Sequence, residues 1–266
     1  MSVYDLGKRR GRGVVRPSPW FLAFVAVTAL GGVLAWTQDG GGSRLGDLGV
    51  FLFVLAGWIV TVCLHEFAHA FAAYRAGDRS VEARGYLTLN PFKYAHPLLS
   101  VVIPLLFIVL GGIGLPGGAV YLHTHAFRSK RAQSMSAAVG PLTNVVLAIV
   151  LLLLVRSHQD LTHPRFWTAM AFLGFLQVTA AVLNLLPVPG LDGYAMIEPY
   201  LDPHSRQIGE KVKPWGMIGV ILVLQFQAIN NAFFDLVNWL YERTGASDLY
   251  WQFGREFFKF WVKNPL

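Results

Sequence analysis

The sequence predicts an all-α polytopic membrane protein, and three observations indicate this fold class. Of the 266 residues, 54% are hydrophobic and only 14% are charged, with a mean hydropathy of +0.47, whereas soluble domains carry about 25% charged residues. The apolar residues gather in runs long enough to cross a hydrocarbon core, which takes about 20 helical residues. Short polar segments separate these runs. The whole chain, 1–266, is therefore expected to form one integral-membrane domain in the cell membrane.

Five apolar stretches meet the length of a membrane-spanning helix, and a sixth is borderline. The five are residues 20–36, 48–73, 132–155, 166–186 and 215–240. The sixth, 98–114, is short and rich in glycine near its end. We therefore predict about five transmembrane helices plus one re-entrant or sixth membrane segment. The aromatic and basic tail at about 241–266 is expected to lie at the membrane interface, with packing on the protein's own spans as the alternative.

The formal net charge of +7 is concentrated just before the first apolar run. The basic residues there are Lys8, Arg9, Arg10, Arg12 and Arg16. Positive charge next to a span favours the cytoplasmic side. We therefore expect a cytoplasmic N-terminus and a lipid bilayer as the partner of this charge, and we do not expect nucleic-acid binding.

The second apolar run contains His65, Glu66 and His69 in a His-Glu-x-x-His pattern. Histidines four residues apart share one face of a helix and can bind one zinc ion, and the adjacent glutamate can act as a general base. Each ionisable side chain costs roughly 2.5–3.5 kcal/mol at the centre of a membrane helix, so three together are hard to explain as bystanders. The alternative is a structural His–Glu hydrogen-bond cluster between helices. We favour zinc, with one ion per chain.

A third zinc ligand has to come from elsewhere in the chain, because catalytic zinc usually takes three protein ligands. The single cysteine, Cys63, excludes a site built from several cysteines. Asp192 lies near the membrane part of a later span, and Pro187 and Pro189 prevent a regular helix before it. Broken backbone at membrane depth is tolerated where it is buried in protein or lines a watery cavity. We expect Gly193 to allow a sharp turn after the ligand.

Two asparagines in apolar surroundings are further candidates for the site. Asn144 closes the sequence Gly-Pro-Leu-Thr-Asn, and an amide inside hydrocarbon needs hydrogen-bond partners. It either binds the substrate backbone or the oxyanion, or it ties two spans together. Asn184 has the same two alternatives.

Taken in order, HEFAH at 65–69, GPLTN at 140–144 and NLLPVPGLDG at 184–193 resemble the motifs of the site-2 protease family of intramembrane zinc metalloproteases. The resemblance covers about 48–193. It implies a three-helix catalytic core, a zinc ion bound by His65, His69 and Asp192, and Glu66 as the catalytic base. Hydrolysis of peptide bonds within or near transmembrane segments of membrane proteins is the implied activity, with a membrane-bound regulator such as an anti-sigma factor as one candidate substrate. We expect a minimal form without PDZ or CBS modules.

The chain departs from the family pattern after the second run. Many members have Asn-Pro-x-x-His-x-Asp-Pro where this chain has residues 90–97, with Tyr94 and His96 at the His and Asp positions. We carry over no function for that segment.

Zinc binding also constrains the topology. If the N-terminus is cytoplasmic, the second run ends inside, the run leading to Asp192 must also point inward, and the segment around Gly140 must start inside. Residues 98–114 then enter and leave the membrane on the same face.

Two other classes of membrane protein were considered. A transporter would also combine a broken helix with a midplane acidic residue, but it leaves the histidine spacing unexplained. A di-metal oxidoreductase would need more inward-facing histidines or carboxylates than the runs contain.

Overall fold

The computed structural model describes residues 15–40, 42–94, 127–158 and 162–262, and within these ranges the fold is helical with no strand. Four helices are long and apolar enough to cross a membrane. They are α1 (Pro19–Thr37), α2 (Arg44–Ala76), α5 (Lys130–Ser157) and α6 (Pro164–Asn184). The predicted all-α polytopic architecture is confirmed, with up to five spans if a bent pair of helices is counted as one.

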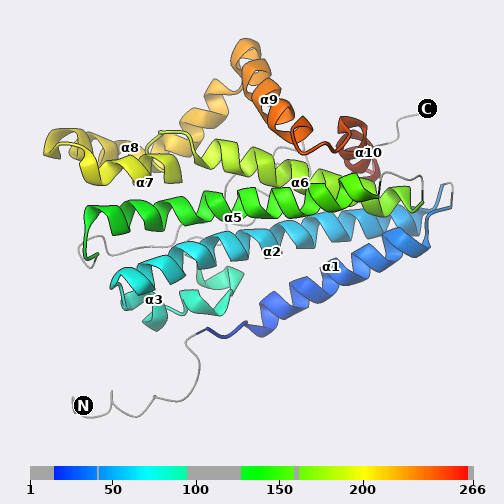
Figure 1. Cartoon of the computed structure of the whole chain (residues 1–266), viewed down its shortest axis with the longest axis horizontal. Coiled ribbons are helices and arrows are strands. Elements are labelled where there is room, and N and C mark those ends of the chain that lie inside the picture. Colours follow the sequence, from blue (N-terminus) through cyan, green and yellow to red (C-terminus); the bar gives the residue numbers. More distant parts are fainter. Residues whose placement is uncertain (1–14, 41, 95–126, 159–161, 263–266) are drawn as a thin grey trace.

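The three helices that carry the motifs lie side by side, and α1 packs on α2 (Figure 1). α2 and α6 run in one direction and α5 runs in the other. The backbone N–H of Arg128 donates to the carbonyl of Ala76 at 3.3 Å, so α5 begins where α2 ends. The connection between them therefore starts and finishes at the same end of the bundle, as the topology argument requires. The path of 98–114 lies outside the described residues.

Serine side chains fix where three of these helices begin. Ser18, Ser43 and Ser129 each accept a hydrogen bond from the backbone N–H three residues ahead, at 3.1, 3.2 and 3.1 Å. Such N-caps satisfy one of the backbone donors that the first turn leaves unpaired. The polar serine thus marks the point at which each apolar run becomes helical.

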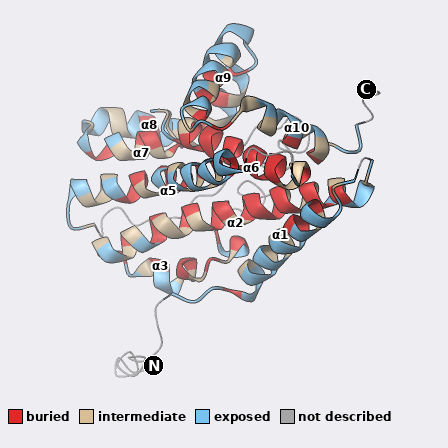
Figure 2. Ribbon diagram, turned by 45° about the vertical axis from the view of Figure 1, so that its right-hand side comes forward, coloured by how far each residue is buried: buried red, intermediate tan, exposed pale blue. Residues whose placement is uncertain are grey.

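Burial differs strongly among the spans (Figure 2). Nearly all of α6 is enclosed by its neighbours, whereas α1 exposes most of its apolar side chains. Its exposed leucines and valines are what a lipid-facing helix presents. The apolar side chains of α6 instead form the centre of the core.

The run at 215–240 is not one straight span, contrary to the sequence expectation. It is divided between α8 (Pro203–Val223) and α9 (Gln227–Glu242), which meet at 96°. At the break, the side chain of Asn230 donates to the carbonyl of Leu224 at 3.1 Å, so a side chain replaces one helical hydrogen bond. The pair passes the length and hydropathy test for a span only when the two helices are taken together.

The C-terminal helix α10 (Asp248–Phe258) packs on α6 and α2. Trp251 stacks on Phe175 with ring centroids 4.0 Å apart, and Phe258 stacks on Phe51 at 5.2 Å. A Cβ on Gly254 would overlap the backbone carbonyl of Thr168, so the two helices touch through their backbones. The described part of the tail therefore packs on the protein's own spans, and its location at the membrane interface stays a prediction.

A buried arginine joins α6 to the turn between α1 and α2. Arg165, with 5% of its surface exposed, donates from Nε to Asp47 at 2.8 Å and from Nη1 to the carbonyl of Gly40 at 3.0 Å. Its backbone N–H donates to Asp39 at 3.2 Å. Because the guanidinium group pairs with both carboxylates, with Asp47 at 2.8 Å and with Asp39 at 3.8 Å, it holds the end of the bundle opposite the start of α5.

We predict that Arg165→Ala lowers the thermal stability of the protein, because Asp39 and Asp47 lose their buried cation. Breaking a buried pair in this way costs up to about 3–5 kcal/mol. Arg44→Ala is the matched control, since Arg44 is exposed at the same end of the bundle. The measurement is thermal unfolding of both purified variants in detergent micelles. Equal melting temperatures would contradict this role of Arg165.

Candidate metal centre

The His-Glu-x-x-His residues lie on the buried face of α2. His65, Glu66 and His69 expose only 7%, 2% and 6% of their surface. One turn of helix separates the two histidines, so their rings lie one above the other with centroids 4.7 Å apart. Both rings point toward α5, as the contacts described below show.

The interruption after α6 brings Asp192 to the histidines. α6 ends at Asn184, and Asp192 is the first residue of the short helix α7 (Asp192–Ile197). The glycine that takes up the left-handed conformation in this segment is Gly190, with φ 100°, and not Gly193 as the sequence suggested. Gly193 is required for a different reason, because a Cβ there would overlap the carbonyl oxygen of Leu185.

The three side chains converge at the spacing of a tetrahedral zinc site. The Nε2 atoms of His65 and His69 are 3.1 Å apart, and the Asp192 carboxylate oxygens lie 3.2 and 3.3 Å from them. Bonds of about 2.0–2.1 Å from a tetrahedral zinc to nitrogen and oxygen place two ligand atoms about 3.3–3.4 Å apart. Among the described residues, these three form a group able to hold a metal ion. Their geometry fits zinc.

The hydrogen bonds of the Nδ1 atoms orient both histidines as metal ligands. His69 Nδ1 donates to the backbone carbonyl of Ser136 at 2.7 Å, and His65 Nδ1 donates to the side-chain oxygen of Asn144 at 2.5 Å. With both Nδ1 atoms protonated, each Nε2 presents a lone pair. Two lone pairs and a carboxylate facing one another repel unless a cation, either a metal ion or an added proton, lies among them.

α5 passes so close to the histidines that only glycine fits at one position. A Cβ on Gly140 would overlap His69 Nε2 and would lie 2.7 Å from His65 Nε2. The same turn of α5 contributes Ser136, whose hydroxyl donates to the carbonyl of His69 at 3.3 Å. Pro141 follows within the helix. The Gly-Pro pair therefore belongs to the wall of the metal centre.

The two asparagines occupy different places relative to this centre. Asn144 is buried and contacts His65, so it lies next to the ligands and links α5 to α2. Its carbonyl oxygen is committed to that imidazole. Asn184 is buried at the end of α6. Within the described residues, no hydrogen bond joins its amide to His65, His69 or Asp192.

Tyr94, the residue at a family histidine position, lies outside the span helices in the sequence and is buried. Its hydroxyl donates to the backbone carbonyl of Cys63 at 3.1 Å. Burial raises the pKa of Tyr94, so the hydroxyl keeps its proton and remains a donor. Tyr94 therefore fixes the end of η3 (Pro91–Lys93) to the helix that carries the histidines. His96 lies outside the described residues.

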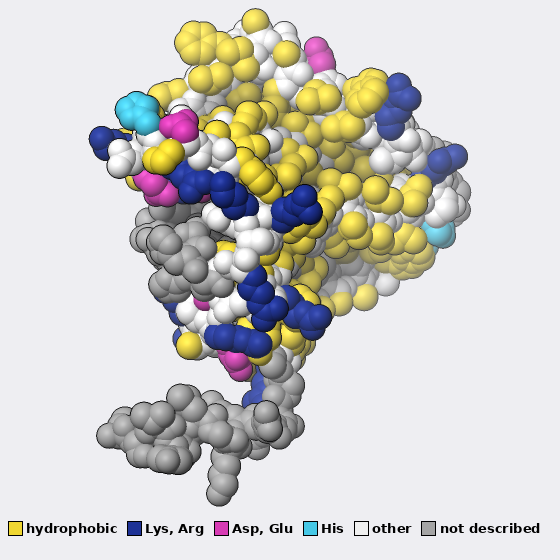
Figure 3. All heavy atoms as spheres, turned by 60° about the vertical axis from the view of Figure 1, so that its left-hand side comes forward, with side chains coloured by type: hydrophobic (Ala, Val, Ile, Leu, Met, Phe, Trp, Pro, Cys, Tyr) yellow, Lys and Arg dark blue, Asp and Glu magenta, His cyan; other side chains and the backbone are white. Residues whose placement is uncertain are grey.

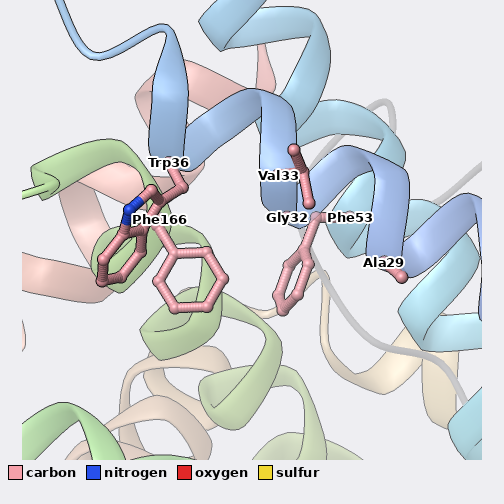
Figure 4. Close-up of a pocket in the computed structure, with 6 residues that line it drawn as sticks. All are labelled: Ala29, Gly32, Val33, Trp36, Phe53 and Phe166. Atoms are coloured by element: carbon pink, nitrogen blue, oxygen red, sulfur yellow. The ribbon is translucent and has the colours of Figure 1, made fainter.

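An apolar groove of about 270 Å³ opens elsewhere, between α1, α2 and α6 (Figure 4). Its lining includes Trp36 at the end of α1 and Phe166 at the start of α6. No ionisable side chain lines it, so it offers no acid, base or metal ligand. The groove lies near the opposite ends of the helices from the metal centre.

Sequence reasoning missed Ser136 and Gln177, and it named Gly140 only as part of the GPLTN motif. Gly140 and Ser136 act through close backbone approach, which no local pattern reveals. Gln177 in α6 hydrogen-bonds to Asn144 at 3.2 Å. An amide in the middle of an apolar span could have drawn attention to Gln177, because such a side chain requires buried partners.

Comparison with known proteins identifies relatives over almost the whole chain. A protein of Mycolicibacterium smegmatis named "Putative zinc metalloprotease Rip2" is 52% identical over 94% of this chain and 96% of its own length. The Rip2 protein of Mycobacterium tuberculosis is 47% identical with the same coverage. YwhC of Bacillus subtilis, also named as a zinc metalloprotease, is 32% identical over 62% of this chain and 76% of its own length. No protein-family model matches the chain, and no solved structure matches it significantly. With relatives this similar, and with the ordered motifs on its three central helices, the chain belongs to the site-2 protease family of zinc metalloproteases.

Proposed function

We propose that this protein is an intramembrane zinc endopeptidase that holds one zinc ion per chain through His65, His69 and Asp192. The observation that carries the proposal is the convergence of these three side chains, from α2 and from the broken segment after α6, at the spacing of a tetrahedral site. Glu66, buried beside both histidines on α2, is the proposed general base. The names of the relatives support zinc-dependent proteolysis, and the apolar helices support a site within the membrane.

The proposed mechanism assigns proton transfer to Glu66. A bound zinc ion supplies Lewis-acid activation of water and of the scissile carbonyl. Glu66 accepts a proton from the attacking water as the new carbon–oxygen bond forms. It then delivers that proton to the amide nitrogen as the carbon–nitrogen bond breaks, which releases an amine and a carboxylic acid, and the amine takes up the second proton of the water when that acid ionises. His65 and His69 stay fixed by α5 throughout, so the two imidazoles do not reorient during the reaction.

The proposed orientation places the metal centre nearer the cytoplasmic side. The described ends of α2 and α5 that meet there carry Arg75, Lys130 and Arg131, and Arg79 and Arg84 flank α3, which follows α2 in the chain and packs on it. Figure 3, turned to bring this end of the bundle forward, shows Lys and Arg side chains gathered over it. Positive charge of this kind favours the cytoplasmic face. The N-terminus before α1 would then also be cytoplasmic, since α1 leads outward and α2 returns.

The proposed substrates are membrane proteins with a transmembrane segment, including membrane-bound regulators such as anti-sigma factors. A substrate helix hides each carbonyl in a hydrogen bond to a later residue. The segment near the scissile bond must therefore unwind before the carbonyl can reach the site between His65, His69 and Asp192.

We predict that Glu66→Gln keeps its zinc and loses hydrolysis, because the amide preserves the shape of the side chain but cannot take a proton. General-base catalysis contributes about 10²–10⁴-fold to a rate, so cleavage should fall by about 100-fold or more. The measurements are zinc content by elemental analysis and cleavage of a single-span substrate in liposomes. Glu82→Gln, at an exposed position in α3 (Ser80–Ala83), is the matched control. Normal cleavage by the Glu66→Gln protein would show that another group is the base.

We also predict that Gly140→Ala loses most of its bound zinc, because the added methyl group would overlap the Nε2 atoms that face the ion. Gly219→Ala is the matched control, since a Cβ at Gly219 in α8 meets no atom within 4 Å. Zinc content after dialysis against a weak chelator distinguishes the two variants. If the Gly140→Ala protein retained zinc as firmly as the control, the close approach of α5 would not define the site.

Cleavage is further predicted to depend on how readily the substrate helix unwinds. In a helix interior, Gly costs about 1 kcal/mol and Pro about 3 kcal/mol relative to Ala, so such residues lower the free energy of exposing a carbonyl. A poly-Leu span should resist cleavage, and a Gly or Asn pair in its cytoplasmic third should restore it. Mass spectrometry of the products in reconstituted membranes identifies the cut. Equal cleavage of both spans, or cutting confined to soluble loops, would indicate a protease that acts at the membrane surface.

A further inference from the structure

A chain of buried polar side chains runs from the metal centre through all three core helices. Asn144 of α5 donates from Nδ2 to Gln177 Oε1 at 3.2 Å, and Gln177 of α6 donates from Nε2 to the hydroxyl of Thr61 at 2.9 Å. Thr61 donates in turn to the carbonyl of Trp58 at 2.8 Å, within α2. The three polar side chains expose 5%, 0% and 5% of their surface. This series of hydrogen-bonded side chains therefore lies wholly inside the bundle and returns to the helix that carries the histidines.

The direction of every hydrogen bond in this chain is fixed from its far end. The Trp58 carbonyl can only accept, so the Thr61 hydroxyl donates to it and its oxygen accepts from Gln177. The Gln177 amide must then turn its nitrogen toward Thr61 and its oxygen toward Asn144. This in turn directs the nitrogen of Asn144 to Gln177 and its oxygen to His65, where the distance to Nδ1 is 2.5 Å. An oxygen at that point requires the proton of His65 on Nδ1.

From this relay we infer that Gln177 is a positioning residue for the zinc ligand His65, an inference that rests on the proposed zinc site. Gln177 fixes which way the Asn144 amide faces, and Asn144 fixes both the ring orientation and the tautomer of His65. In the opposite amide orientation, the Asn144 nitrogen would face Nδ1, and the proton of the neutral imidazole would move to Nε2. An Nε2 that carries a proton cannot bind a metal ion.

The surroundings of Gln177 indicate why a polar side chain occupies this position. It stands at the centre of α6, among apolar residues, and it is the one amide side chain between the two ends of that helix. A buried amide inside a membrane span is unfavourable unless both its donor and its acceptor are paired. A leucine would fill the same space in the core without this requirement. The pairing with Asn144 and Thr61 accounts for a glutamine at this position.

The test compares three variants with the unmodified protein for zinc affinity by competition with a chromophoric chelator. Gln177→Leu removes both hydrogen-bonding groups at similar volume and should weaken zinc binding by about 10- to 100-fold, the usual effect of losing a partner that orients a metal-bound histidine. Gln177→Glu, as the neutral acid inside the core, keeps a carbonyl oxygen that accepts from Asn144 and a hydroxyl that donates to Thr61, so its affinity should stay close to that of the unmodified protein. Thr179→Val is the matched control, because Thr179 is equally buried in α6 but bonds only to its own helix at Phe175.

A second measurement separates orientation of the histidine from general loss of packing. Spectra of ¹⁵N-labelled histidine in the zinc-free protein report which ring nitrogen carries the proton. We expect His65 to be protonated on Nδ1 in the unmodified protein and in Thr179→Val. In Gln177→Leu, where the Asn144 amide can turn over, the resonance should change toward the Nε2-protonated form.

Each outcome of these measurements either supports or overturns the positioning role of Gln177. Unchanged zinc affinity in Gln177→Leu, or equal weakening in Gln177→Leu, Gln177→Glu and Thr179→Val, would overturn the positioning role while leaving the zinc site intact. If Gln177→Leu does not fold, Thr61→Val decides, because it cuts the relay at its far end. Weaker zinc binding in Thr61→Val supports the inference, and unchanged binding refutes it. Failure of the unmodified protein to bind zinc would overturn the proposed function and this inference with it.

Discussion

The constraint on which the rest of the structure depends is that a polar group placed among membrane helices must be paired with another polar group. The two histidines meet it through α5, which supplies an acceptor to each Nδ1 atom, from Ser136 and from Asn144. Once Nδ1 is occupied in this way, only Nε2 remains to face the centre of the bundle. The requirement to satisfy buried donors thus also orients both histidines as the proposed zinc site needs them.

Close approach of the helices is the second requirement, and glycine meets it at two points. Gly140 lets α5 reach the histidines, and Gly193 lets α7 fold back against the end of α6 so that Asp192 faces them. Larger side chains at either position would hold the ligands apart. Pro187 and Pro189 interrupt the helix after α6. Asp192, which follows this buried span, can therefore lie level with the two histidines within α2. The metal centre is therefore formed by the packing of three helices and by one break.

Much of this arrangement could be predicted from the sequence, because the strongest signals are local. Apolar runs give the four long helices, and the spacing of His65 and His69 gives one face of α2. Predictions failed where the structure depends on contacts between distant segments. The right-angled bend between α8 and α9 is not marked by a proline or glycine at its corner, and the role of Gln177 depends on partners far away in the chain. Asn144 had two open alternatives because its sequence surroundings do not reveal that it contacts His65.

X-ray absorption spectroscopy at the zinc edge, combined with metal analysis of the purified protein, tests the central claim most directly. The account predicts one zinc ion per chain, with two imidazole nitrogens and carboxylate oxygen at about 2.0–2.1 Å. It predicts no sulfur neighbour at about 2.3 Å, because Cys63 is buried outside the group formed by His65, His69 and Asp192. A protein without stoichiometric zinc, or a zinc ion with a sulfur ligand or a single imidazole, would contradict the account.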